Sequence, residues 1–196
     1  MTVSLDGGRV LFLRTRGGED PVSCLWRLDL ADGAGDGGGR ERLLADPAAP
    51  WNSGPGEVPE AERVRRERTR ETAAGIVAYS ADADCRTVAF ALDGRLWVLR
   101  VGDDPGAPPG VPEPVPAADA VTDARIDPTG QRVAYVADGA LHVTELAGGT
   151  GRLLAAPEHD DVSYGLAEHV AAESMYRYRG YWWAPDGRRL LAARVD

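Results

Sequence analysis

DPTGQRVAYVADGALHVTEL, residues 127–146, decides the fold, because it joins a turn to two strands. Asp, Pro, Thr and Gly open it as turn residues, and RVAYV then reads as an alternating apolar strand. A second alternating run, LHVTEL, begins at Leu141. The same order of turn, arginine and strand recurs in DGGRVLFL from Asp6, DADCRTVAF from Asp82 and PDGRRLLAA from Pro185. The pattern indicates a repeated unit of short strands.

Further strands follow the first three copies of this unit. They are LWRLDL from Leu25, LWVLRV from Leu96 and LHVTEL, with third pieces RERLLAD from Arg40 and GRLLAA from Gly151. Arg86, Arg132 and Arg189 lie 46 and 57 residues apart. Units of this length, each unable to bury its own face, are typical of propeller blades. The sequence predicts an all-β fold, a partial β-propeller of about three and a half four-stranded blades. We expect the fourth unit to break off in mid-blade after LLAARVD.

Two short helical insertions are expected in this propeller. Apart from them, DGAGDGGG from Asp32 has the composition of a flexible loop, and a strand-like run follows where a dinucleotide site would need a helix. PEAERVRRERTRETAAG from Pro59 predicts a charged helix within about residues 57–75, with glutamates interleaved among arginines as on a solvated, ion-paired face. Apolar residues at helical spacing predict a second helix at about residues 167–178.

Charge and composition exclude several classes of function. The net charge of -9 argues against a nucleic-acid or anionic-membrane surface, because phosphates are neutralised by clustered cations. No run approaches the roughly 20 apolar residues of a membrane span, and the N-terminal residues lack the pattern of a secretory signal. Cys24 and Cys85 are the two cysteines and suit reduced thiols, so a cytoplasmic location is expected. His159 lacks the spacing of a metal ligand, and neither a metal nor a cofactor is expected.

Two runs near the end of the chain resemble a known family. They are AEHVAAESM, residues 167–175, and GYWWAPDG, residues 180–187. Both are similar to motifs in the N-terminal propeller domain of dipeptidyl peptidase IV-like members of the prolyl oligopeptidase family. ERVRRER, residues 62–68, is a second point of resemblance to bacterial propellers of this type. The resemblance covers essentially the entire chain, 1–196, and corresponds to the first part of the family's propeller.

The resemblance implies a substrate-binding role for Glu173 and Ser174. In the family a pair of glutamates holds the free amino terminus of a peptide, and a buried ammonium needs charged acceptors on several sides. Glu173 matches the first of the pair, while Ser174 stands where the second would be. A serine hydroxyl accepts a hydrogen bond but brings no charge. Helical spacing alone favours another interpretation, in which Glu173 forms an exposed ion pair with Arg177 four residues later.

The sequence lacks the chemistry of peptide hydrolysis. A serine peptidase of this family needs a G-x-S-x-G nucleophile elbow on an α/β-hydrolase domain, and none of the serines is flanked by glycines at that spacing. We expect an inactive propeller portion that gates and positions the amino terminus of a peptide for a catalytic domain absent from this chain. The expected partners are that domain and the missing blades, or a second copy of the chain. The alternative is a non-catalytic interaction module or a degenerate fragment.

Overall fold

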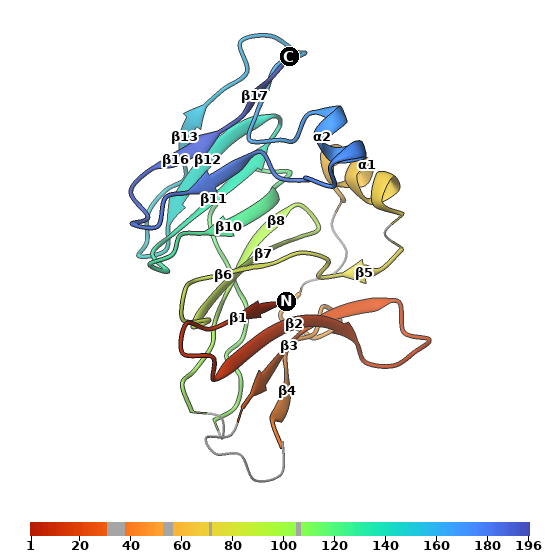
Figure 1. Ribbon diagram of the computed structural model, residues 1–196, viewed down its shortest axis with the longest axis vertical. Coiled ribbons are helices and arrows are strands. Elements are labelled where there is room, and N and C mark those ends of the chain that lie inside the picture. The colour runs from red at the N-terminus through yellow and green to blue at the C-terminus, as the bar shows by residue number, and fades with distance from the viewer. Residues whose placement is uncertain (31–37, 53–56, 71, 105–106) are drawn as a thin grey trace.

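Strands dominate the computed structural model, which describes residues 1–30, 38–52, 57–70, 72–104 and 107–196 (Figure 1). Most of the expected flexible loop from Asp32 lies outside these residues. The first blade is a meander of β1 (Thr2–Val3), β2 (Arg9–Thr15), β3 (Val22–Asp29) and β4 (Arg40–Ala45). The second contains β6 (Ser80–Ala81), β7 (Thr87–Leu92), β8 (Arg95–Arg100) and β9 (Glu113–Pro114). The third contains β10 (Thr122–Ile126), β11 (Arg132–Ala137), β12 (Ala140–Glu145) and β13 (Arg152–Ala155).

A fourth unit begins after the third blade. It consists of two antiparallel pairs, which join β14 (Ser163–Tyr164) to β17 (Arg194–Val195) and β15 (Tyr181–Trp183) to β16 (Leu190–Ala192). The expectation of three four-stranded blades and the start of a fourth is therefore confirmed. Successive side chains of each strand point to opposite faces of the sheet. Each blade therefore needs a neighbour on both sides to cover its apolar residues.

The core lies between consecutive blades, which follow one another along the long axis of the molecule (Figure 1). Leu11 and Leu25 of the first blade pack in one cluster with Phe90 and Trp97 of the second. A second cluster joins blades two and three, and a third joins blade three to the fourth unit through the fully buried Tyr181. The hydrophobic stabilisation thus resides in the joints between blades.

The two helices are shorter than expected. The helix α1 (Glu60–Thr69) is followed by Arg70, whose left-handed φ of 52° stops the helix. The strand β5 (Ala74–Gly75) then pairs in parallel with β3. The helix α2 (His169–Ser174) is capped by Glu168, whose carboxylate accepts hydrogen bonds from the N–H groups of Val170 and Ala171, and it does not continue to residue 178. The chain leaves the helix because Tyr176 has a φ of 52°. No helix in the described ranges is long and apolar enough to cross a membrane.

Each blade enters its second strand through the same turn. The first residue of the turn donates its main-chain N–H to the carbonyl five residues later, at 2.8–3.0 Å. The four such pairs are Ser4 and Arg9, Asp82 and Thr87, Asp127 and Arg132, and Ala184 and Arg189. The structural repeat therefore differs slightly from the sequence pattern. Thr87 occupies the place of the recurring arginine, where the sequence suggested Arg86.

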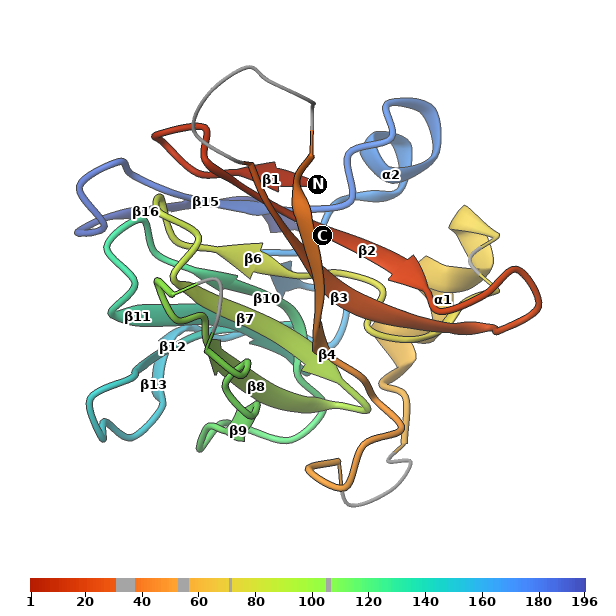
Figure 2. The ribbon, with the colours of Figure 1, turned by 90° about the horizontal axis from the view of Figure 1, so that it is seen from below.

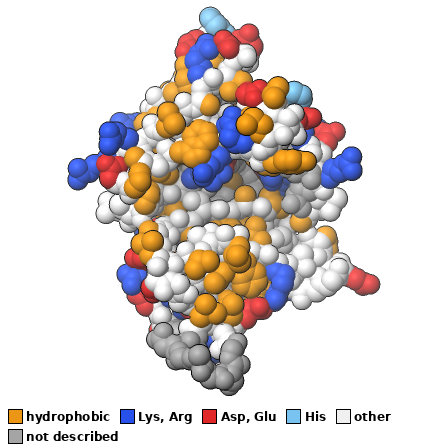
Figure 3. Space-filling model, in the orientation of Figure 1, with side chains coloured by type: hydrophobic (Ala, Val, Ile, Leu, Met, Phe, Trp, Pro, Cys, Tyr) orange, Lys and Arg blue, Asp and Glu red, His pale blue; other side chains and the backbone are white. Residues whose placement is uncertain are grey.

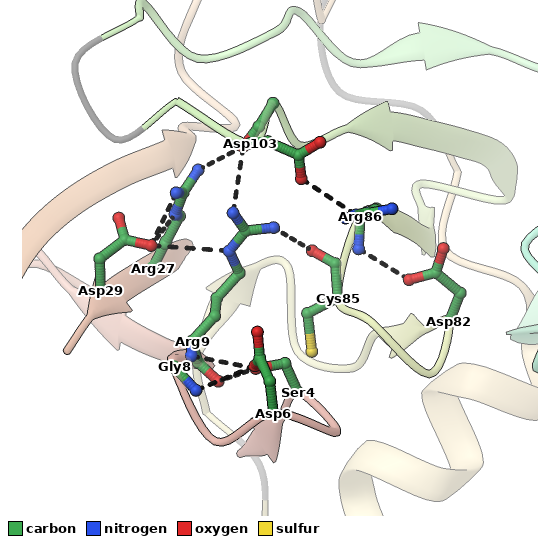
Figure 4. Close-up of polar contacts among 11 residues, drawn as sticks. Ser4, Asp6, Gly8, Arg9, Arg27, Asp29, Asp82, Cys85, Arg86 and Asp103 are labelled. Carbon is green, nitrogen blue, oxygen red and sulfur yellow. Dashed lines mark hydrogen bonds and ion pairs between the residues drawn. The ribbon is translucent and has the colours of Figure 1, made fainter. Parts of the chain in front are cut away.

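Side chains of neighbouring turns match in size across the joints. A Cβ atom added at Gly130 would lie 2.7 Å from Oδ2 of Asp82, and one added at Gly187 would lie 3.0 Å from Oδ2 of Asp127. These glycines and Cys85 occupy the same left-handed position of the turn, with φ between 56° and 72°. Cys85 lies in the turn of the second blade. The turn of the preceding blade begins with the smaller Ser4, and the sulfur of Cys85 points toward it (Figure 4). A large residue at the start of one turn is thus accommodated by a glycine in the next.

Two arginines tie the first blade to the second. Arg9 donates to the carbonyls of Cys85 and Gly102, both at 3.3 Å, and Arg27 donates to the carbonyl of Gly102 at 2.7 Å (Figure 4). Asp29 lies 2.6 Å from Arg27 and 3.6 Å from Arg9 and so offsets both charges. Since Arg27 is only 2% exposed, this cluster holds the joint in a largely water-free environment.

Candidate functional site

The helices α1 and α2 lie on the same side of the stack of blades, although about a hundred residues separate them (Figures 1 and 2). An ion pair links them, with 3.7 Å between Nε of Arg68 and Oε1 of Glu173. The side chain of Glu173 is 46% exposed, so this contact is loose and leaves the carboxylate able to bind another cation.

The charged face of α1 is organised by Glu62. Its carboxylate accepts hydrogen bonds from Arg65 at 2.7 Å and from Arg66 at 2.8 Å. Burial acts to raise the pKa of Glu62, but the bonds from the two arginines outweigh it, and the pKa lies below its usual value. The interleaved charges are thus ion-paired as the sequence predicts, but this part of the face is not solvated as expected, because the side chain of Glu62 is only 16% exposed.

A cavity of about 300 Å³ lies between the helices and the third blade. It has apolar and charged walls, formed chiefly by Val64, Leu166 and Tyr178 and by Glu62, Arg65, Arg68, Asp123 and Arg125. Ala172 of α2 also lines it and is the residue before Glu173. Figure 3 shows the surface hollowed beside the helices, with basic side chains at the rim. Glu173 therefore lies next to a cavity large enough for part of a small ligand.

Asp123 and Arg125 form a partly buried ion pair in this cavity wall. Oδ1 of Asp123 lies 2.6 Å from Nη2 of Arg125. Oδ2 of Asp123 and Nε of Arg125 are shielded from solvent and have no hydrogen-bond partner among the described residues. Burial raises the pKa of Asp123 above its usual value, and the attraction of Arg125 only partly opposes this. Asp123 could not be singled out from the sequence, because VTDARI carries no sign that this residue lines a cavity.

The two sequence-predicted residues differ in their surroundings. Glu173 is brought to Arg68 of α1, and the alternative pair with Arg177 does not form, because α2 ends before Arg177. Arg177 instead donates to the carbonyl of Arg179. Ser174 is exposed at the end of the helix, and its hydroxyl forms no hydrogen bond within the described part of the chain. In the same ranges no three His, Cys, Asp or Glu side chains are grouped as metal ligands.

Comparisons with known proteins agree with this architecture. Residues 76–196 match the family described as the dipeptidyl peptidase IV (DPP IV) N-terminal region. Mouse dipeptidyl peptidase 8 is 26% identical over 140 residues, which are 65% of this chain and 16% of that protein. The crystal structure of Porphyromonas gingivalis dipeptidyl peptidase 4 superimposes with a TM-score of 0.57 at 13% identity, over 98% of this chain and 24% of that one.

The structural likeness supports the fold, and this chain spans only a small part of the length of both relatives. The matched region includes α2, the cavity wall at Asp123 and all strands of blades two and three. Because the family match covers more than half of the chain, the protein belongs to the family of the dipeptidyl peptidase IV N-terminal region.

Proposed function

We propose that this chain is the substrate-positioning portion of a dipeptidyl peptidase IV-like serine peptidase, and that Glu173 holds the free amino terminus of the peptide. The observation that carries the proposal is the position of Glu173, which lies beside a cavity and is loosely paired with a cation of the other helix. Family membership supports the same role.

The chemistry of Glu173 suits an ammonium ligand. Arg68 orients the carboxylate toward α1, but the 3.7 Å contact leaves room for further hydrogen bonds. A hydrogen bond to a charged group contributes about 1.5–3 kcal/mol, which corresponds to roughly ten- to hundredfold in affinity. The Glu173 carboxylate would thus distinguish a peptide with a free amino terminus from one whose amine is acylated.

Hydrolysis is assigned in this proposal to an α/β-hydrolase domain outside the 196 residues, because the chain has no G-x-S-x-G nucleophile elbow. The proposed partners are that domain and further blades, which would cover the fourth unit, or a second copy of the chain. We place the protein in the cytoplasm, since Cys24 and Cys85 are buried free thiols of the kind that reducing compartments preserve.

One observation favours a second function, that of a non-catalytic interaction module. Ser174 replaces a charged member of the family's pair, and its exposed hydroxyl has no contact within the described residues. In a module of this kind the amino-terminus site would have been lost and the cavity would not distinguish charged from acylated peptides.

The test is a calorimetric titration of the chain with valyl-proline amide and with its N-acetyl derivative. We expect the free amine to bind at least about tenfold more tightly, and Glu173→Gln to abolish that preference. The matched control is Glu67→Gln, which neutralises another exposed glutamate, on α1, and should keep the preference. A wild-type chain that binds both peptides equally, or neither, would contradict the proposal and favour the interaction module.

A further inference from the structure

Asp123 occupies an unusual place in the backbone. Thr122 pairs with Val136 and Arg125 pairs with Ala134, so β10 has one residue more than its partner between these points. This bulge gives Asp123 a φ of 46°, in the left-handed region that costs energy for most residues. Bulges and strained residues are concentrated at sites where a side chain must be aimed out of the regular ladder. Here the residue at the bulge is Asp123, which lines the cavity.

The carboxylate of Asp123 is only half satisfied. Oδ1 is held by Arg125, whereas Oδ2 has no hydrogen-bond partner among the described residues. A buried polar atom without a partner is rare in proteins and calls for an explanation such as a ligand. Arg179 contributes attraction to Asp123 but forms no ion pair with it in the described structure, and its guanidinium lies over the ring of Trp182 instead.

The other cations of the cavity wall are already neutralised. Arg65 is bound to Glu62, and Arg68 is paired with Glu173. Oδ2 of Asp123 is therefore a carboxylate oxygen of a cavity-lining residue that is enclosed and has no hydrogen-bond partner among the described residues. Because it is shielded from water, a cation that reaches it would be bound more strongly than at the surface.

We propose that Asp123 provides the second carboxylate for the peptide's α-ammonium, the role that Ser174 leaves open. This inference rests on the proposed function. In this arrangement the ammonium binds between Glu173 of α2 and Asp123 of β10, from two different elements, whereas the family motif places both acids on one helix. The apolar walls at Val64, Leu166 and Tyr178 then receive the first side chain, so the preferred substrates begin with an apolar residue.

The first experiment uses the peptide pair described above. Asp123→Asn should lower the affinity for valyl-proline amide by at least about tenfold and leave that for the N-acetyl peptide unchanged. Asparagine tolerates the left-handed backbone and keeps an acceptor for Arg125. Glu67→Gln is again the matched control and should bind as wild type, and adding Ser174→Glu to Asp123→Asn should restore affinity.

The outcomes separate the two proposals. If the wild-type chain does not prefer the free amine, the proposed function fails and this inference fails with it. If the wild type prefers the amine and Glu173→Gln loses the preference, but Asp123→Asn retains it, the role of Asp123 is overturned while the proposed function stands. Loss of binding to the N-acetyl peptide as well would show that Asp123 has only a structural role, and would also overturn the inference.

A second measurement on the wild-type chain does not depend on the folding of any variant. The sequence has 22 arginines and no lysine, so no lysine side chain competes with the peptide as a primary amine. A water-soluble carbodiimide joins a carboxylate to an amine as an amide, and the water lost converts the reagent to a urea. With valyl-proline amide present, mass spectrometry should find the peptide attached to both Asp123 and Glu173. Attachment to Glu173 without any at Asp123 would overturn the inference.

Discussion

Replacing Asp127 with alanine tests how strongly the turn carboxylates stabilise the turns that lie between neighbouring blades. Asp127 is fully buried. Its oxygens accept hydrogen bonds from the Thr129 hydroxyl at 3.0 Å, the Gln131 N–H at 2.9 Å and Nε of Arg132 at 3.2 Å. Alanine leaves these donors without a partner and leaves the Arg132 charge unpaired beside the fourth unit. Breaking a buried charged pair costs about 3–5 kcal/mol, and because Arg132 is partly exposed we expect a loss of about 3–4 kcal/mol.

The assay is urea unfolding of the chain, followed by tryptophan fluorescence. With a slope of about 2 kcal/mol per molar, the midpoint of Asp127→Ala should fall by about 1.5–2 M. Asp127→Asn keeps an acceptor and should lose about half as much. The control is Asp186→Ala in the fourth unit, because Asp186 is half exposed and its change should stay within about 0.5 kcal/mol. A midpoint for Asp127→Ala within about 0.5 M of wild type would refute the reasoning.

Three further predictions concern the joints, the thiols and catalysis. Gly130→Ala should destabilise the chain by at least about 2 kcal/mol, because its Cβ would lie 2.7 Å from Oδ2 of Asp82. In the same urea assay Gly7→Ala, with a similar φ and nothing within 4 Å, should lose only the smaller cost of backbone strain. Burial raises the pKa of the Cys24 and Cys85 thiols to about 11, so iodoacetamide should label neither at about pH 8 until urea unfolds the chain. The usual pKa of a cysteine thiol is 9.0, so the stability that the neutral thiols contribute is complete below pH 9.0 and is lost as the pH rises through about 11. Melting curves recorded across this pH range would reveal the loss. The chain should not release the chromophore from an X-Pro chromogenic dipeptide, and activity that persists through purification would contradict its lack of a nucleophile elbow.

Repetition made the fold predictable, whereas local backbone geometry did not show in the sequence. The turn-and-strand units are visible in composition and alternation, so the blades and the start of the fourth unit follow from them. Apolar spacing around Val170 predicted too long a helix, because it contains no signal for the left-handed Tyr176. Asp123 was missed for a related reason, since a bulge depends on the register between two strands. The role of Glu173 came from a family resemblance and stays a prediction.

The matched turns at the joints also determine the order in which the units can follow one another. A copy of the second blade placed after itself would set the Cys85 side chain against Asp82, two side chains in a space that elsewhere holds one. A copy of the third blade placed after the first would set Gly130 against Ser4 and leave a void. Although the units share one architecture, they are therefore not interchangeable modules. Duplicating or shuffling a blade would require a compensating change in the turn of its neighbour.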